Sequence, residues 1–276
     1  MKKTTILSGL ILLFAFSPIT TNAQFWKKIQ DKVEKKAVDV TDDMLNGSND
    51  QEESTTAQGN ASKGQVPYVE EVFSFVPGSN IYFQDDYDNE NLGSMPRYWK
   101  TNGTGSIVEI PGLPGKWLKL GDRSSYKLDT LLAMPKGNFT LEFDIVTRSD
   151  KAKDIGGMNF GFSKDNAVRS WISDAYNDNS ITSTELHFWN RDVSNSSSDT
   201  KVSNTLDFPL DNYGNALIHV SIAVDGGQMR LYLDKSKLLD AKMFLNEPTK
   251  YFYISAPLDM DQGAQLFIGN LKIANN

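Results

Sequence analysis

The strongest constraint on the fold is a two-residue alternation of apolar and polar side chains that begins after residue 66. Residues 139–145 (FTLEFDI) alternate in this way. So do residues 218–224 and 229–233, which are joined by Asp-Gly-Gly at 225–227. Successive side chains of a β-strand point to opposite faces, so each segment predicts a strand with one buried and one solvated face. The last two segments and their turn predict a β-hairpin.

More short segments of this kind follow, separated by Gly, Asn, Asp and Pro turns. Residues 251–254 and 266–273 are expected to be closing strands, and no long helical pattern interrupts the series. Many short strands with such turns are typical of two packed antiparallel sheets. We therefore expect an all-β, two-sheet antiparallel sandwich over residues 66–276. The chain has no cysteine, so a sizeable core and not disulfides must hold this domain together.

Residues 1–23 have the three parts of a secretory signal peptide. A positively charged start (MKK) precedes an apolar run at 7–16, and TNA at 21–23 fits a small-residue cleavage site. The apolar run is about ten residues long, and crossing a bilayer needs roughly 20. We expect export to the periplasm, the outer membrane or the cell surface. No cysteine follows the cleavage site, so a lipoprotein anchor is not expected.

Two segments separate the signal peptide from the sandwich. In residues 24–45 apolar side chains recur every three or four positions, which predicts a short amphipathic helix. This helix either rests on its own domain, acts as a spacer, forms a coiled coil or lies on an anionic membrane surface. Residues 46–65 are almost entirely polar, and we expect a flexible, disordered linker there.

The charge balance excludes some partners. The chain has 35 acidic and 28 basic residues and a net charge of −7. Nucleic-acid binding needs a basic surface, so no nucleic-acid partner is expected. His187 and His219 are the only histidines, which argues against a His-rich metal centre.

Two stretches carry a resemblance to a known family. The first covers residues 76–99 and continues to GKWLKL at 115–120, and the second is LFIGNLKI at 266–273. Over roughly residues 68–276 the chain resembles the concanavalin A-like (laminin G-like) jelly-roll domain of exported Bacteroidetes envelope proteins. In that family the domain often stands between a Lys-rich helix and an OmpA-type peptidoglycan-binding domain. This sequence ends after the last expected strand, so anchoring through an OmpA-type domain is not expected.

One strand comes close to a catalytic motif. Laminarinase-type glycoside hydrolases share the jelly-roll fold and carry Glu-x-Asp-x-x-Glu, with nucleophile and acid/base about 5 Å apart. Glu142 and Asp144 match the first two positions. Thr147, or Val146 in a one-residue-shorter form, stands where the second glutamate belongs, and neither can protonate a leaving group. We therefore expect a non-catalytic strand with outward polar side chains and no catalytic residues.

Asp85 and Asp86 are the candidate calcium ligands. Adjacent carboxylates at the start of a jelly roll, joined by backbone carbonyls from a loop, suit a hard cation that prefers oxygen. In related carbohydrate-binding sandwiches a structural calcium often lies near this strand. The alternative is a solvated acidic turn, and no other cofactor is indicated.

Aromatic rings that stack on sugar faces, with polar groups that fix hydroxyls, define the candidate ligand site. The candidates are Trp171, His187, Trp189, Arg230 and Tyr232. His187 and Trp189 should share one face of a strand-like segment, with Phe188 on the other. Core or rim positions are the alternative for each ring. Residues 190–204 are polar and predict a long loop at the sandwich edge.

These features favour an exported binding module that recognises a glycan or an envelope component without catalysis. One alternative is a glycoside hydrolase or lyase with an unrecognised site. The other is a structural or adhesive envelope protein that makes protein contacts only.

Overall fold

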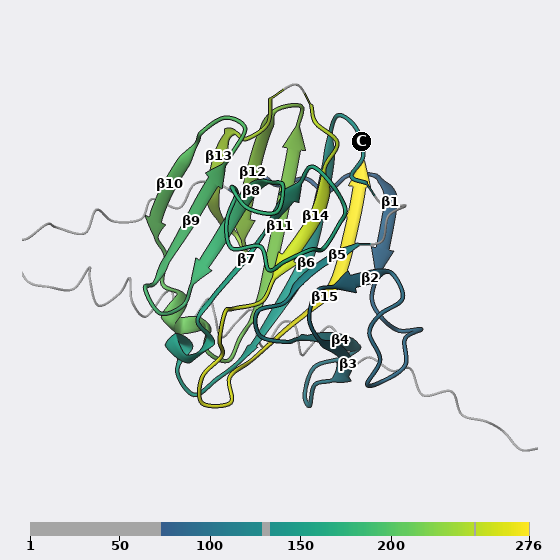
Figure 1. The fold of residues 1–276 in the computed structure, drawn as a ribbon, viewed down its shortest axis with the longest axis vertical. Coiled ribbons are helices and arrows are strands. Elements are labelled where there is room, and N and C mark those ends of the chain that lie inside the picture. The colour runs from purple at the N-terminus through teal and green to yellow at the C-terminus, as the bar shows by residue number, and fades with distance from the viewer. Residues whose placement is uncertain (1–72, 129–132, 246, 276) are drawn as a thin grey trace, which may run out of the picture. The chain divides into compact units, whose positions relative to one another are not determined.

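A computed structural model describes residues 73–128, 133–245 and 247–275, all of which belong to the unit Pro67–Asn276. Within these ranges the chain forms two antiparallel sheets that lie one behind the other in the view of Figure 1. The predicted all-β, two-sheet antiparallel sandwich is therefore confirmed.

Sheet A has eight strands within the described residues. Their spatial order is β13 (Ser236–Lys242), β12 (Gln228–Leu233), β11 (Leu217–Asp225), β6 (Phe139–Arg148), β15 (Gln265–Asn275), β4 (Lys116–Leu120) and β3 (Gly105–Glu109), with β1 (Asn80–Asp85) also paired to β15. The N-terminal half of β15 pairs with β4 and its C-terminal half pairs with β1.

Sheet B has seven strands within the described residues. Their spatial order is β10 (Ser203–Asp207), β9 (Asp192–Ser197), β8 (Ser180–His187), β7 (Gly157–Ser163), β14 (Tyr251–Ser255), β5 (Ser125–Leu128) and β2 (Trp99–Thr101). Two short 3₁₀ turns, η1 (Ala152–Ile155) and η2 (Leu210–Tyr213), lie between strands.

The predicted hairpin is present. β11 and β12 pair in antiparallel register with Asp225 opposite Gln228, so Gly226 and Gly227 form a two-residue turn. Gly226 has a φ of +58°, a backbone conformation that glycine adopts without strain. The two expected closing strands correspond to β14 and β15.

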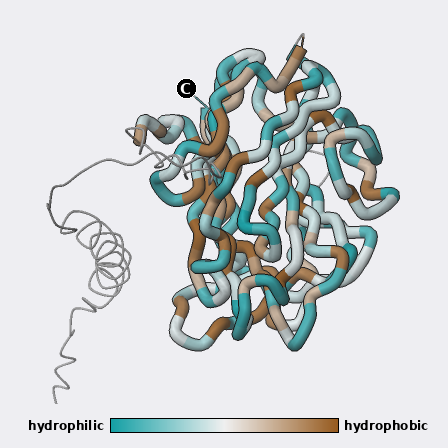
Figure 2. The backbone as a smooth tube through the Cα atoms, turned by 90° about the vertical axis from the view of Figure 1, so that its left-hand side faces the viewer, coloured by the Kyte–Doolittle hydropathy of each residue, from teal (hydrophilic) through white to brown (hydrophobic). Residues whose placement is uncertain are grey.

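The alternating side chains build the core between the sheets. On β6 Phe139, Leu141, Phe143 and Ile145 are all buried, and the ring of Phe143 packs edge-on against Phe160 of β7, with centroids 5.3 Å apart. Hydrophobic and hydrophilic segments follow one another in short steps along the chain in Figure 2. Successive side chains of a strand point to opposite faces, so the outer faces are left mainly for polar side chains. The exception is a smaller apolar cluster on the outer face of sheet A, formed by Ile110, Trp117, Val146 and Phe267.

The prediction of a long polar loop at 190–204 is wrong for most of that segment. β9 and β10 form an antiparallel hairpin at the edge of sheet B. The inward positions Asn195 and Ser197 are buried, yet they are polar, so the sequence lacks the usual apolar alternation. Asn195 donates to the carbonyl of Leu238 (3.3 Å), and Ser197 donates to the carbonyl of Met243 (2.7 Å). These hydrogen bonds, to β13 of sheet A and to the residue directly after it, replace apolar packing.

The predicted signal peptide, helix and linker (1–23, 24–45 and 46–65) lie outside the described residues. Among the residues that are described, no helix has the length and apolar character needed to cross a membrane.

Candidate functional site

A cleft opens on the outer face of sheet B between two loops. The 164–179 loop joins β7 to β8, and the 256–264 loop joins β14 to β15. β7 and β8 form the floor, where Glu185 and His187 point away from the core because Leu186 between them points into it. The cleft has a volume of about 510 Å³. Its lining includes Asn159, Trp171, Asp174, Glu185, His187 and Trp189.

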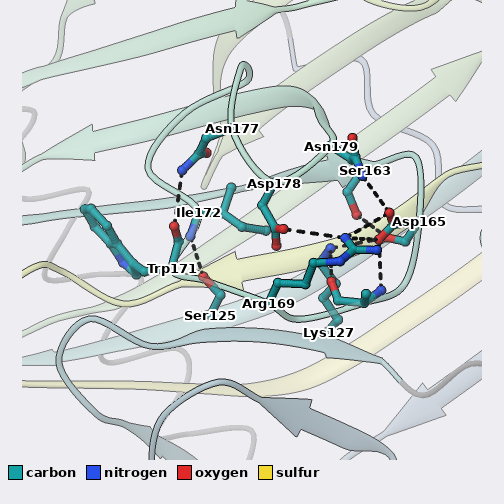
Figure 3. Close-up of polar contacts among 11 residues, drawn as sticks. Ser125, Lys127, Ser163, Asp165, Arg169, Trp171, Ile172, Asn177, Asp178 and Asn179 are labelled. Carbon is teal, nitrogen blue, oxygen red and sulfur yellow. Dashed lines mark hydrogen bonds and ion pairs between the residues drawn. The ribbon is translucent and has the colours of Figure 1, made fainter.

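A buried lysine holds the first of these loops against the sheet. Lys127 on β5 is fully buried, and its Nζ donates hydrogen bonds to the backbone carbonyls of Asp165 (3.2 Å) and Ala167 (2.8 Å) (Figure 3). Burial lowers the pKa of the Lys127 ammonium, and the carboxylates of Asp178 and Asp165 partly offset this effect. Both carboxylates also pair with Arg169 at the loop surface, at 3.1 Å for Asp165 and 3.6 Å for Asp178.

Further hydrogen bonds orient the part of this loop that carries Trp171. The amide of Ile172 donates to the hydroxyl of Ser125 (2.8 Å), and the side-chain amide of Asn177 donates to the carbonyl of Trp171 (3.2 Å) (Figure 3). The indole N–H of Trp171 donates to the carbonyl of Ala256 (2.9 Å), which begins the second loop. Trp171 therefore links the two loops that flank the cleft.

Asn159 on β7 has a side-chain oxygen without a hydrogen-bond partner. Its side-chain amide donates to the carbonyls of Ile172 (3.0 Å) and Ser173 (2.7 Å), and only 4% of the residue is exposed. Its Oδ1 has no hydrogen-bond partner. A buried polar atom left unpaired costs about 1–3 kcal/mol. In the lining of a cleft, such an atom marks a position where a ligand or a water can donate a hydrogen bond.

A glycine allows the second loop to approach the floor of the cleft. Gly156 precedes β7 with a φ of +84°, and a Cβ there would lie 2.9 Å from the carbonyl oxygen of Asp259. Only a residue without a side chain fits this conformation and this distance together.

His187 lies between two carboxylates. Its Nδ1 is 2.6 Å from Oδ1 of Asp192, its cross-strand neighbour, and its Nε2 is 3.2 Å from Oε2 of Glu185. The hydrogen bond with Glu185, reinforced by Asp192, raises the pKa of the imidazole despite its partial burial. Trp189, in the turn after β8, is 60% exposed, and its ring centroid lies 5.7 Å from that of His187.

The structure thus brings together Trp171, His187 and Trp189 from the sequence-based candidates. Phe188 is buried in the core while Trp189 is exposed, so His187 and Trp189 lie on the same side as the alternation indicates.

Arg230 and Tyr232 do not join them. Both lie on β12 of sheet A. Tyr232 is fully buried, Phe73 packs edge-on against its ring, and its hydroxyl shares a hydrogen bond with Ser74 (3.0 Å). Its ring is therefore not free to stack on a ligand. Arg230 lines a separate, smaller cavity of about 140 Å³ together with residues 74–76.

Asn159, Glu185 and Lys127 belong to the site or its support but carry no sequence motif. Glu185 could have been found from alternation alone, since it lies two positions before His187 on one strand. The roles of Asn159 and Lys127 can be recognised only from the position of the 164–179 loop over the sheet.

Glu142 and Asp144 lie on the outer face of sheet A, around His219 of β11. The Nδ1 of His219 is 2.7 Å from Oδ1 of Asp144, and its Nε2 is 3.5 Å from Oε2 of Glu142. These carboxylates, Asp144 first, raise the pKa of His219 to about 9. Thr147 is fully buried, and its hydroxyl donates to the carbonyl of Tyr213 (2.5 Å). The residue at the position of the second glutamate is therefore buried and supports the fold.

The aspartates proposed for calcium are at the end of β1. The carboxylate of Asp85 is mostly buried and accepts hydrogen bonds from the amide of Tyr87 (3.2 Å) and the indole of Trp99 (3.1 Å). Asp86 accepts one from the amide of Asp88 (3.1 Å). No group of three or more His, Cys, Asp or Glu side chains within the described ranges could hold a metal ion. Calcium at Asp85 and Asp86 stays a prediction.

No protein-family model matches the sequence, and no curated protein matches it. Among solved structures, the chain is similar to the carbohydrate binding module CBM66 from Bacillus subtilis, with 14% identity, 64% of this chain and 96% of that chain covered, and a TM-score of 0.43. The lumenal domain of VIP36 in its Ca²⁺/Man-bound form shares 13% identity over 66% of this chain and 84% of that chain, with a TM-score of 0.48. The receptor binding domain of botulinum neurotoxin mosaic serotype C/D shares 16% identity and has a TM-score of 0.46. It is matched over 71% of this chain, which spans 47% of that domain's length.

Proposed function

We propose that this chain is an exported binding module that holds a carbohydrate in the sheet B cleft and does not cleave it. The observation that carries the proposal is that Trp171 and Trp189 line the same cleft as Asn159, a residue whose Oδ1 has no hydrogen-bond partner. Apolar ring faces beside fixed polar groups are what sugar recognition requires, because a pyranose offers both C–H faces and hydroxyls.

The supports of the cleft favour binding by a preformed site. Lys127, Ser125 and Asn177 fix the backbone of the 164–179 loop through hydrogen bonds. A ring held in place before the ligand arrives loses little conformational freedom on binding, which preserves affinity.

The arrangement of acidic residues supports a non-catalytic role. Glu142 and Asp144 are on the other sheet and are paired with His219. In the cleft, Glu185 is bonded to His187, and Asp174 accepts hydrogen bonds from the amide of Tyr176 (2.6 Å) and the hydroxyl of Ser173 (3.0 Å). These carboxylates position neighbouring groups, whereas a glycosidase needs one carboxyl free to donate a proton to the leaving group.

The predicted signal peptide supports a place in the periplasm, at the outer membrane or on the cell surface. In this proposal residues 24–65 space the sandwich from an attachment point, so that the cleft meets glycans of the envelope or of the surroundings. The calcium proposed at Asp85 and Asp86 would be structural, since these residues are the last of β1 in sheet A and the one after it, and the cleft is on sheet B.

The test is a glycan array probed with the mature chain from Gln24 onward, followed by calorimetric titration of the hits. Trp189→Ala removes a 60% exposed ring and leaves the core intact, and Trp171→Ala removes the opposite ring. Each should weaken binding about tenfold or more, as buried aromatic contacts do. Tyr82→Ala is the matched control, because Tyr82 is a 44% exposed ring on β1 of sheet A.

Two results would overturn the proposal: no glycan binds the chain, or binding persists unchanged in both tryptophan variants. Release of reducing sugar from a bound glycan, lost in Glu142→Gln, would instead support a glycoside hydrolase.

A further inference from the structure

The polar lining of the cleft consists mainly of hydrogen-bond acceptors. Asp174, Glu185 and Asp259 bring carboxylates to the lining, and Asn159 brings its unpartnered Oδ1. The lining belongs wholly to the described part of the chain and contains no lysine or arginine. A ligand that fits these groups must therefore supply donors.

The one basic side chain of the lining is already engaged. His187 lies between Glu185 and Asp192, with both ring nitrogens within 3.2 Å of a carboxylate oxygen. Even when it is protonated, His187 neutralises only one of these two charges, so the cleft keeps an excess of negative charge.

The edge of the cleft beside the 256–264 loop carries further negative charge. Asp259 and Asp261, both in the 256–264 loop, raise the pKa of Asp122 after the larger effect of its burial, so their negative charges act on this edge. No set of described side chains here is suited to hold a metal ion. The unsatisfied acceptor of Asn159, 4% exposed at the floor, is independent of these charges and points to an organic ligand with donor groups.

We propose that the cleft selects glycans that contain positively charged amino sugars and rejects acidic glycans; this inference rests on the proposed function. A sugar ammonium offers three N–H donors and a charge that the carboxylates stabilise, while its ring stacks on Trp171 or Trp189. A uronic acid or sulfated sugar would place like charges together without a cation between them, which costs affinity.

The experiment compares two pairs of ligands that differ in charge and share the same backbone. The first pair is the tetramer of glucosamine and the tetramer of N-acetylglucosamine. The second is oligogalacturonate and its methyl ester. Calorimetric titrations use the mature chain at about pH 6, below the pKa of a sugar amine, and at about 0.15 M salt, which screens non-specific attraction to the acidic surface.

We expect the glucosamine tetramer to bind about tenfold more tightly than its acetylated form, the gain of a charge-assisted contact. The methyl ester should bind more tightly than oligogalacturonate. Glu185→Gln should bring the first ratio towards one, and Glu109→Gln, at an exposed position on β3 of sheet A, should leave it unchanged. Asp259→Asn is a second variant of the cleft whose exposed position does not endanger folding.

Equal binding of the two tetramers overturns the charge selection, and so does tighter binding of oligogalacturonate than of its methyl ester. In either case the proposed function survives if Trp171→Ala abolishes binding of the glycan. A preference for glucosamine that Glu185→Gln and Asp259→Asn leave as large as in the parent chain also overturns it, because the attraction would then lie elsewhere on the surface. Absence of binding to every glycan removes the proposed function itself.

Discussion

The two histidines of the chain have nearly the same immediate surroundings on opposite sheets. His187 on sheet B and His219 on sheet A each face a cross-strand aspartate and a glutamate, and in both cases the aspartate is the closer partner, at 2.6 and 2.7 Å. In both, the carboxylates raise the pKa of the imidazole. Their surroundings beyond these partners differ.

Around His219 the charges are balanced by side chains of sheet A itself. Lys272 lies 3.7 Å from Oε1 of Glu142. The side-chain amide of Asn270 donates to Asp144 (2.7 Å), as the side-chain amide of Asn190 does to Asp192 beside His187. His187 instead has Trp189 beside it and the cleft in front, and its side chain is 21% exposed compared with 43% for His219. A histidine between two carboxylates on the face of a sheet therefore forms only a surface ion network. The loops that flank His187 make its network part of a candidate site.

The largest expected effect comes from releasing the loop that makes this difference. Lys127→Met removes the hydrogen bonds to the carbonyls of Asp165 and Ala167. The Asp165 carbonyl keeps the hydroxyl of Ser163 (2.8 Å), whereas the carbonyl of Ala167 loses its lysine partner. We expect a loss of about 1–3 kcal/mol in the free energy of unfolding by urea. Hydrogen exchange in the 164–179 loop should accelerate and glycan binding should weaken, because the segment before Trp171 loses its anchor to the sheet while the hydrogen bonds of Trp171 and Ile172 remain.

A matched control exists on sheet A. Lys116 donates to the carbonyls of Asp88 (2.8 Å) and Glu90 (2.7 Å) and so holds a different loop in the same manner. Lys116→Met should leave glycan affinity at the parent value. If Lys127→Met retained that affinity too, the loop would not be what distinguishes the two faces.

A smaller effect is expected from His219, in the pH dependence of stability. Its pKa of about 9 lies above the ordinary value of 6.5, so the folded state holds this proton more tightly than the unfolded chain. The stabilisation is full below about pH 6.5 and is lost as the pH rises through about 9. Because 43% of the side chain is exposed, solvent screening limits it to about 1 kcal/mol or less.

Urea unfolding of the parent and of His219→Gln at about pH 6 and about pH 10 measures this contribution. The parent should be the more stable protein at the lower pH, and the gap should close at the higher pH. A gap that widens with rising pH would contradict the assigned direction.

The smallest effect is a shift in a titration curve, and it compares the two histidines directly. With two histidines in the chain, each imidazole can be followed by NMR. Saturating glucosamine tetramer should lower the pKa of His187, because a nearby ammonium disfavours the imidazolium. The His219 curve should stay in place. Equal shifts at both residues would show that the ligand does not distinguish the two sheets.

The fold was largely predictable because alternation is a local signal. In residues 139–145 of β6 and 218–224 of β11 every second residue is a large apolar side chain that faces the core, so both strands could be predicted from the sequence. β9 lacks this alternation because its buried Asn195 and Ser197 are polar and donate hydrogen bonds to the carbonyls of Leu238 and Met243. A buried polar residue looks like a loop residue until its partner is known.

The candidate site was predictable only in part, for the same reason. The sequence alone identifies Trp171, His187 and Trp189 as side chains that could contact a ligand of the sandwich, and it gives the net charge of the chain. It cannot show that Lys127 reaches a carbonyl 40 positions away, or that Trp171 bonds to Ala256 across 85 positions. Side-chain chemistry and the strand period depend on residues that are neighbours in the sequence. The packing of distant segments creates the cleft, leaves Oδ1 of Asn159 without a partner and separates Tyr232 from the other rings. Only the tertiary structure decides that packing.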